Sequence, residues 1–174
     1  MTKEDLKQNI YNASYLTGKF LLRSGQYSSE YFDKYRFESD PFLLKSVANE
    51  LKNLIPSNTD ILAGLEMGAI PIAAAISMEL NLPCVFVRKE AKKYGTSKII
   101  EGIDIKDKNV CIIEDVITTG GQVLLSLEDL RKDGARVNTV VCVIDRSISP
   151  IQKFADKNLH IKSLFTKKDF DSCK

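Results

Sequence analysis

Two adjacent carboxylates stand where an apolar run gives way to a turn of small residues. The run begins at Val110, the carboxylates are Glu114 and Asp115, and the turn Thr118–Gly121 contains only threonine and glycine. Such a turn lets backbone N–H groups approach a phosphate closely, and the helix predicted after it adds a partial positive charge. The carboxylates could accept two sugar hydroxyls, or hold Mg²⁺ directly or through water. The pattern therefore predicts a site for a phosphorylated sugar.

A structural interpretation of the same turn stays open. Asp and Gly often occupy strand-to-helix turns for helix capping and for positive φ angles. The length and detail of this run nevertheless favour ligand binding. The chain contains no G-x-x-x-x-G-K-[ST] motif, so the turn is not the phosphate loop of ATPases.

A second chemical feature is the positive charge between Arg88 and Lys98. Five cations stand in this segment against one anion, Glu90, whereas the whole chain has a net charge of only +2. The segment could be a solvated helical turn, as most charge runs are. Its one-sided charge and Gly95 instead favour a loop that closes over a polyanion. There Lys and Arg would stabilise a departing diphosphate, and closure would exclude water.

Gly64–Pro71 is another candidate strand-to-helix turn. One interpretation is a turn with spaced glycines and no ligand. The functional interpretation is that the backbone N–H groups of Glu66 and Met67 bind a pyrophosphate at the start of the next helix.

The rest of the composition excludes several classes of protein. The single histidine, His160, lies in an alternation typical of a surface strand, and the four cysteines form no C-x-x-C pair, so we expect no histidine catalysis, zinc site or disulfide. The small net charge gives no reason to expect a nucleic-acid partner. The longest apolar run, residues 69–78, is too short to span a membrane, and the charged N-terminus lacks a signal-peptide core. We therefore expect a cytoplasmic protein.

The elements that must position these residues alternate between strand and helix patterns. A helix is predicted from Thr2, two short strands or a hairpin at residues 18–23 and 31–37, and a helix from Asp40–Pro41 to near Pro56. The later predicted elements are a strand at 60–65, a helix at 69–80, strands at 84–88 and 109–114, a helix at 121–132, and strands at 136–144 and 159–165.

This alternation predicts the α/β class, with a doubly wound, mostly parallel sheet flanked by helices. We expect one domain over residues 1–174, with residues 1–40 as a small N-terminal cap and 41–174 as the α/β core. In such sheets ligands bind beyond the carboxyl ends of the strands. The predicted strand ends at Leu65, Arg88, Asp115 and Arg146 should therefore converge on one crevice.

These motifs together resemble a known family. The run 112–121 closely resembles the phosphoribosyl-pyrophosphate (PRPP) signature of type I phosphoribosyltransferases. Three further motifs resemble the orotate phosphoribosyltransferases: the Arg-Lys-x-x-Lys-x-x-Gly loop that begins at Arg88, the basic–Ser–Gly turn and aromatic pair within 18–33, and the Asp–Arg pair at 145–146. The resemblance spans residues 15–150, which is most of the chain.

The resemblance implies transfer of the phosphoribosyl group of PRPP to orotate, giving orotidine 5′-monophosphate and pyrophosphate in pyrimidine (UMP) biosynthesis. Mg²⁺ would be the cofactor, held through PRPP and water near Glu114 and Asp115 without a direct protein ligand. A homodimer would share the catalytic loop across its interface. The residues that the resemblance implies to be catalytic are Arg88, Lys89, Lys92 and Asp115.

The resemblance also assigns binding residues. The residues implied for PRPP are Arg23, Glu66, Met67, Arg88, Lys89, Lys92, Tyr94, Glu114, Asp115, Val116, Ile117, Thr118, Thr119, Gly120, Gly121 and Gln122. Those implied for orotate, whose carboxylate suits a guanidinium fork, are Tyr31, Phe32, Thr118 and Arg146. A strained backbone, with a cis non-proline bond as one form of it, is implied in the 64–71 turn.

Some assignments keep alternatives. Tyr31 and Phe32 could be core packing, and Arg146 could be a surface ion-pair partner. Many family members carry Lys where Arg23 stands and His where Tyr94 stands. These differences change the charge and the hydrogen-bond donors that the two positions offer to PRPP. A phosphoribosyltransferase for another base, or a PRPP-binding regulator without catalysis, also remains possible.

The expected mechanism is substitution at ribose C1. Pyrophosphate departs, the ring gains oxocarbenium character, and orotate N1 attacks the opposite face. Because orotate N1 is acidic enough to arrive as an anion, no strong base is needed. Catalysis would then depend on positioning and electrostatic stabilisation.

Overall fold

The sheet that carries the predicted turns is the centre of the fold. The computed structural model describes residues 1–21, 25–91, 98–147 and 151–173. Within these residues a six-stranded sheet has the order β5-β4-β3-β6-β7-β8, and only the edge strand β5 is antiparallel to its neighbour. Its strands are β3 (Ile61–Leu65), β4 (Cys84–Val87), β5 (Ile100–Glu101), β6 (Asn109–Ile117), β7 (Arg136–Asp145) and β8 (His160–Thr166).

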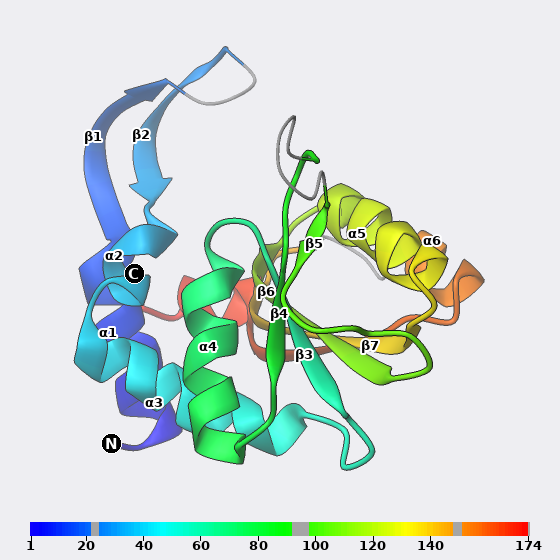
Figure 1. Ribbon diagram of the computed structural model, residues 1–174. Helices are drawn as coiled ribbons and strands as arrows, with labels where there is room; N and C mark the ends of the chain where they lie inside the picture. Colours follow the sequence, from blue (N-terminus) through cyan, green and yellow to red (C-terminus); the bar gives the residue numbers. More distant parts are fainter. Residues whose placement is uncertain (22–24, 92–97, 148–150, 174) are drawn as a thin grey trace.

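Helices cover both faces of this sheet. The chain runs from β3 to β4 through α4 (Ala69–Leu80), which moves it toward the β5 edge of the sheet. It runs from β6 to β7 through α5 (Gly121–Lys132), which moves it toward the β8 edge. Because such crossovers are right-handed, the two helices lie on opposite faces. Figure 1 shows α3 (Pro41–Leu51) beside α4, and α6 (Gln152–Asp156) beside α5. The predicted doubly wound, mostly parallel fold is therefore confirmed.

The strands are apolar because both faces are covered. Every residue of β3 is buried, and β7 is buried without interruption from Thr139 to Ile144. The runs therefore lack the apolar–polar alternation of a sheet with one wet face. Cys111 and Cys142 are buried within these strands as unpaired thiols, and burial raises the pKa of both.

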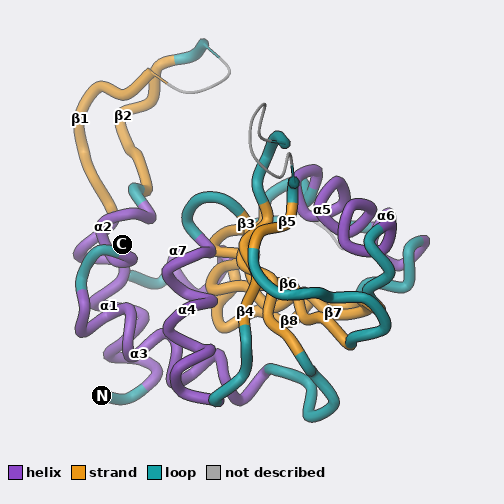
Figure 2. Tube along the Cα trace, in the orientation of Figure 1, coloured by secondary structure: helices purple, strands orange, loops and turns teal. Residues whose placement is uncertain are grey.

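The N-terminal segment forms a separate layer at one side of the sheet. Helix α1 (Lys3–Ser14) begins with a reciprocal capping box between Thr2 and Asp5, and buries Leu6 and Ile10 in the core. The antiparallel hairpin of β1 (Tyr15–Leu21) and β2 (Tyr27–Phe32) follows. Figure 2 shows this hairpin standing away from the rest of the chain. No helix in the described ranges is long and apolar enough to cross a bilayer.

The predicted hairpin is confirmed, but its second strand lies at Tyr27–Phe32 rather than at 31–37. Strand β2 ends at Phe32, and helix α2 (Lys34–Glu38) follows. The side chain of Asp33 accepts a hydrogen bond from the Tyr35 N–H at 3.2 Å, which caps the helix. Phe37 then reaches the core, where it is fully buried. Tertiary burial of one aromatic side chain therefore overrides the strand-like composition of this segment.

Other element boundaries also differ from the predictions. Helix α3 ends at Leu51 and continues as the short 3₁₀ helix η1 (Lys52–Leu54), rather than extending to Pro56. Strand β6 runs three residues further than predicted, so that both carboxylates lie within it. The elements β5, α6 and α7 (Lys167–Asp171) were not predicted, because five residues or fewer are too short to show a period.

Candidate active site

The carboxyl ends of the parallel strands meet at one edge of the sheet. The register pairs Leu65 of β3 with Val87 of β4, and Ile117 of β6 with Asp145 of β7. Strand β6, which carries the acid pair, stands in the middle of this order. The strand ends meet at one edge as expected, and two hollows of this edge, one on either side of β6 in the strand order, are lined by described residues.

The turn Thr118–Gly121, here called the phosphate turn, leads from β6 into α5. Gly120 has φ +70°, and a Cβ at this position would lie 2.6 Å from the Phe154 ring, so only glycine fits without rearrangement. Thr118, Thr119 and Gly121 are exposed at the start of the twelve-residue helix α5. The turn therefore presents backbone donors and the positive end of a helix dipole to solvent.

The residues that flank the phosphate turn differ in burial and in their hydrogen bonds. Val116 is half-buried and Ile117 is buried, so the latter contributes backbone rather than side chain to the edge. The Ile117 carbonyl accepts a hydrogen bond from the Arg146 N–H at 2.8 Å. Gln122 donates to the Ser126 hydroxyl at 3.4 Å, one turn along α5.

Asp115 is held inside the molecule. Its side chain is 1% exposed, and its carboxylate forms an ion pair with the ammonium group of Lys34 on α2. Gly68 packs directly against it, because a Cβ at Gly68 would overlap the Asp115 carboxylate and lie 3.0 Å from Glu38 Oε1. Helix α2, the turn before α4 and the end of β6 are thus packed around one carboxylate.

We call Lys34, Glu38, Glu114 and Asp115 the acid cluster. Burial, followed by the negative charge of Asp115, raises the pKa of Glu38 to about 8. Burial also raises the pKa of Glu114 well above its ordinary value, with Asp115 adding to the effect. Burial by itself would lower the pKa of Lys34, but the adjacent Asp115 carboxylate outweighs it and raises that pKa. Of these groups, Glu38 therefore keeps its proton at neutral pH.

The sequence analysis did not identify Lys34 and Glu38. Lys34 stands in the segment predicted as a strand and Glu38 directly follows it; in an extended chain the two would lie about 13 Å apart and would not be recognised as neighbours. On a helix their i,i+4 spacing places them on one face. This spacing was the available signal, but it has meaning only once the segment is known to be helical.

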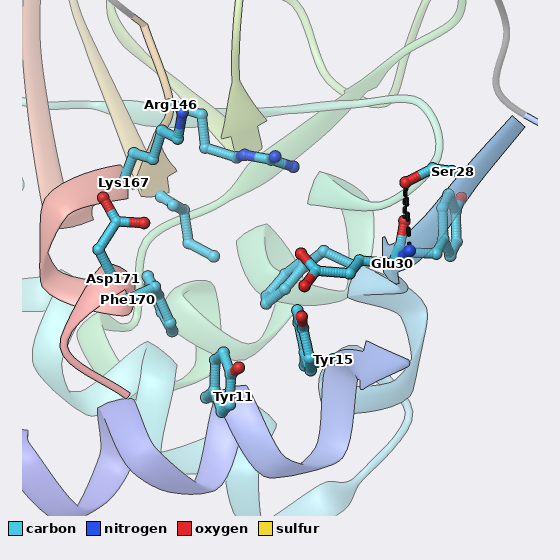
Figure 3. A pocket seen from close by; sticks show the side chains of 11 residues that line it. Tyr11, Tyr15, Ser28, Glu30, Arg146, Lys167, Phe170 and Asp171 are labelled. Atoms are coloured by element: carbon cyan, nitrogen blue, oxygen red, sulfur yellow. Dashed lines mark hydrogen bonds between the residues drawn. The ribbon is translucent and has the colours of Figure 1, made fainter. Parts of the chain in front are cut away.

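The first hollow, here called the hood pocket, has a volume of about 440 Å³ and lies between the N-terminal segment and the ends of β7 and β8 (Figure 3). Three residues predicted for base binding line it: Tyr31, Phe32 and Arg146. Arg146 is exposed and reaches into the pocket. Thr118 is not among its lining residues. The complete lining is Tyr11, Tyr15, Ser28, Glu30, Tyr31, Phe32, Ile144, Arg146, Lys167, Phe170 and Asp171.

Aromatic side chains form much of the wall of the hood pocket. The Tyr11 and Tyr15 rings stack with centroids 4.7 Å apart, and Phe32 meets Phe170 edge-on at 5.8 Å. A hydrogen bond to Glu30, together with burial, raises the pKa of Tyr15 to about 12, so this phenol remains neutral. The pocket thus combines flat apolar surfaces with polar groups, as a planar heterocycle requires.

The second hollow, here called the edge pocket, has a volume of about 420 Å³ beyond β3 and β4. Glu66, Met67 and Arg88 line it, and the Glu66–Met67 peptide bond is cis, as the resemblance implied. One expectation is corrected: the Glu66 N–H donates to the Val87 carbonyl at 2.8 Å, so it is not available to a pyrophosphate. The Glu66 carboxylate instead accepts the Lys89 N–H at 2.9 Å.

The described part of the basic segment begins beside this edge pocket. The Arg88 N–H donates to the Ile99 carbonyl at 2.8 Å, and its side chain donates to the Glu90 carbonyl at 3.3 Å. Both ends of the segment are therefore anchored at the sheet edge. The predicted site residues Arg23, Lys92 and Tyr94 lie outside the residues that the structure describes.

Comparison with known proteins identifies the family. The family model "Phosphoribosyl transferase domain" matches residues 42–169. An orotate phosphoribosyltransferase of a Nocardioides species is 50% identical over 159 residues, covering 91% of this chain and 89% of the relative. This chain belongs to the orotate phosphoribosyltransferase family. A second family member, from Methanocella arvoryzae, is 41% identical over 147 residues and covers 84% of each chain.

Solved structures agree with this assignment. The orotate phosphoribosyltransferase of Aeropyrum pernix is 28% identical, with a TM-score of 0.83 over 96% of this chain and 97% of that one. The Leishmania donovani UMP synthase is 31% identical, with a TM-score of 0.82 over 99% of this chain but only 38% of that larger chain. Both likenesses extend over the N-terminal hairpin as well as the sheet, so the whole described fold is that of an orotate phosphoribosyltransferase.

Proposed function

We propose that this protein transfers the phosphoribosyl group of PRPP to orotate, giving orotidine 5′-monophosphate and pyrophosphate in pyrimidine biosynthesis. The observation that carries the proposal is the order of features along one sheet edge. The phosphate turn and the acid cluster stand between an aromatic pocket with Arg146 and a pocket with Arg88. A ribose bound at the phosphate turn could lose pyrophosphate toward the edge pocket and gain orotate from the hood pocket.

Each group of residues at this sheet edge has its own proposed role. The phosphate turn would receive the 5′-phosphate through backbone N–H groups. Glu114, which is half-buried, would accept ribose hydroxyls, while Asp115 is anchored by Lys34 and orients the end of β6. The hood pocket would hold orotate, with its carboxylate toward Arg146. The edge pocket and the segment that begins at Arg88 would receive the diphosphate.

The reaction then needs little proton transfer. The bond between ribose C1 and the pyrophosphate oxygen breaks, and its electron pair leaves with the pyrophosphate. The orotate N1 anion supplies the pair for the new bond on the opposite face. Arg88, Lys89 and Lys92 would stabilise the charge that develops on the leaving group. Holding orotate N1, ribose C1 and the pyrophosphate oxygen in line supplies the remainder of the rate enhancement.

Mg²⁺ is part of the proposal as the cofactor. Mg²⁺ usually keeps several waters and binds through one or two carboxylates together with substrate phosphates. The acid pair fits that pattern, because Asp115 is already engaged by Lys34, whereas Glu114 is half-buried and would hold the ion through water. Among the described residues, no group of three or more His, Cys, Asp or Glu side chains could hold a metal by itself. The ion would neutralise diphosphate charge when it binds with PRPP.

A homodimer that shares the basic loop between subunits is also proposed, together with a cytoplasmic location. The family resemblance supports the dimer and the loop exchange. Membership of the orotate phosphoribosyltransferase family supports the location as well.

A single assay tests the proposed reaction. Protein, Mg²⁺ and PRPP are mixed with orotate, uracil or adenine, and loss of each base is followed separately. We expect orotate to be consumed and pyrophosphate to appear in equal amount. Consumption of uracil or adenine instead would indicate a phosphoribosyltransferase for another base. PRPP binding without turnover of any base would indicate a regulator.

A further inference from the structure

The ends of β7 and β8 place two cations next to each other. The register pairs Asp145 of β7 with Thr166 of β8, and these strands are parallel neighbours. The residues that follow this pair are Arg146 and Lys167. Both side chains line the hood pocket and are exposed, and Figure 3 shows them on the same wall.

The position of Lys167 is fixed by its local structure. Thr166 caps α7 reciprocally with Asp169, whose carboxylate accepts from the Thr166 N–H at 2.6 Å and from its hydroxyl at 2.8 Å. Phe170 holds the helix against the molecule through edge-on contacts with Phe32 at 5.8 Å and Phe165 at 5.5 Å. Lys167 is the first residue of this anchored helix, so its backbone is held beside the pocket.

Two carboxylates, Glu30 and Asp171, also line the hood pocket. Glu30 belongs to the hairpin on the opposite side and accepts a hydrogen bond from Tyr15. Asp171 stands one helical turn after Lys167 on α7. Among the described residues that line the pocket, the cations are Arg146 and Lys167. The wall formed by the ends of β7 and β8 therefore carries two cations and one carboxylate, a net charge of +1, and faces a hydrogen-bonded carboxylate and aromatic rings.

We infer that Lys167 is a specificity-determining residue, a second cation that binds the carboxylate of the base together with Arg146. The inference rests on the proposed function and deepens it. A carboxylate has two oxygens and about four acceptor positions, more than one guanidinium uses. A guanidinium and an ammonium on adjacent strand ends can each donate to it. A neutral base has no such acceptor, so Lys167 favours orotate over uracil.

The test uses steady-state kinetics of the full chain with a matched control. Lys167→Ala is compared with Lys168→Ala, which removes the next lysine of the same helix, a residue outside the pocket lining. We expect Lys167→Ala to raise the KM for orotate about tenfold, the size of a partly solvated charge-assisted hydrogen bond. The KM for PRPP should change less than about twofold. Lys168→Ala should leave both constants unchanged, and Lys167→Arg should restore most of the orotate affinity.

A neutral analogue separates charge recognition from a structural effect. Orotamide has the shape of orotate without the negative charge, and its inhibition constant is measured in each variant. We expect this constant to be the same in the wild-type protein and in Lys167→Ala. Equal losses for orotate and orotamide, or an unchanged KM for orotate, would overturn the inference. Failure of the wild-type protein to consume orotate would instead overturn the proposed function, so the two failures are distinguishable.

Discussion

A single buried carboxylate, Asp115, connects three parts of the molecule. Its ion pair with Lys34 brings the N-terminal segment to the end of β6, and Gly68 packs against it from the turn before α4. Removing one partner of a buried pair costs more than the pair contributes, because the remaining charge is left without compensation. Residues of three separate elements therefore fix the end of β6, from which the phosphate turn begins.

Lys34→Met tests this anchor. We expect the free energy of unfolding to fall by about 2 kcal/mol, which is less than for a fully buried pair because the Lys34 side chain is 31% exposed. Urea denaturation followed by circular dichroism measures the change. Lys45→Met, an exposed lysine on α3, is the matched control and should stay within about 0.5 kcal/mol of the wild-type protein. Equal stability of both variants would show that the ion pair does not anchor Asp115.

The pKa of Glu38 predicts how stability depends on pH. This pKa is about 8 in the folded protein, above its ordinary value of 4.5. The folded state therefore binds the proton more tightly than the unfolded state. The resulting stabilisation is complete below pH 4.5 and is lost as the pH rises through 8.

Glu38→Gln removes this titration but keeps a hydrogen-bonding amide. We expect the wild-type protein to lose about 1–2 kcal/mol more than the variant between pH 6 and pH 9, after allowing for partial solvent screening. Urea denaturation at both pH values measures the loss. Glu50→Gln on α3 is the control and should follow the wild-type curve. Parallel curves for the wild-type protein and Glu38→Gln would contradict the prediction.

At the scale of elements, the phosphate turn depends on one glycine. Gly120 combines a positive φ with close contact to the Phe154 ring of α6. The turn is therefore supported by a short helix that was not predicted and that stands about thirty residues further along the chain. Neighbouring elements, rather than the turn residues alone, determine the direction of its N–H groups.

Gly120→Ala should damage both stability and PRPP binding. A Cβ would be strained at φ +70° and would lie 2.6 Å from Phe154, so we expect a loss of about 2 kcal/mol in stability and a higher KM for PRPP. Thermal denaturation and initial rates measure the two effects. Gly121→Ala is the control for stability only, because the nearest atom to its Cβ would be 3.9 Å away. Similar losses of stability in both variants would argue against a special role for Gly120.

At the scale of the whole molecule, the proposed exchange of the basic loop predicts complementation between two inactive variants. Lys92→Ala and Glu114→Gln should each lower turnover by about 10²–10³-fold without unfolding the protein. In a mixed dimer, one site would combine an intact Glu114 with the partner's intact loop. We therefore expect activity well above that of either parent after the two variants are mixed and allowed to exchange subunits. Activity that remains at the level of the parents would place the loop in its own subunit's site.

The long elements of this protein were predictable from local patterns. The bounds of α4 and α5 agree with the prediction, because helical spacing and flanking turn residues define them within a dozen residues. The order of strand, acid pair and phosphate turn was also evident, since all three are contiguous in the chain. Helix α2 was mispredicted because five residues are too few to show a helical period, and the buried position of Phe37 is a tertiary feature.

The sequence by itself determined the α/β class, the family and the residues contiguous with β6, because these depend on short-range spacing. Tertiary structure alone decided which distant residues join them. Lys34 meets Asp115 across 81 positions of the chain, and Lys167 comes beside Arg146 through the register of β7 and β8. Such contacts depend on how packed elements place their side chains in space, and no local pattern of residue types contains that information.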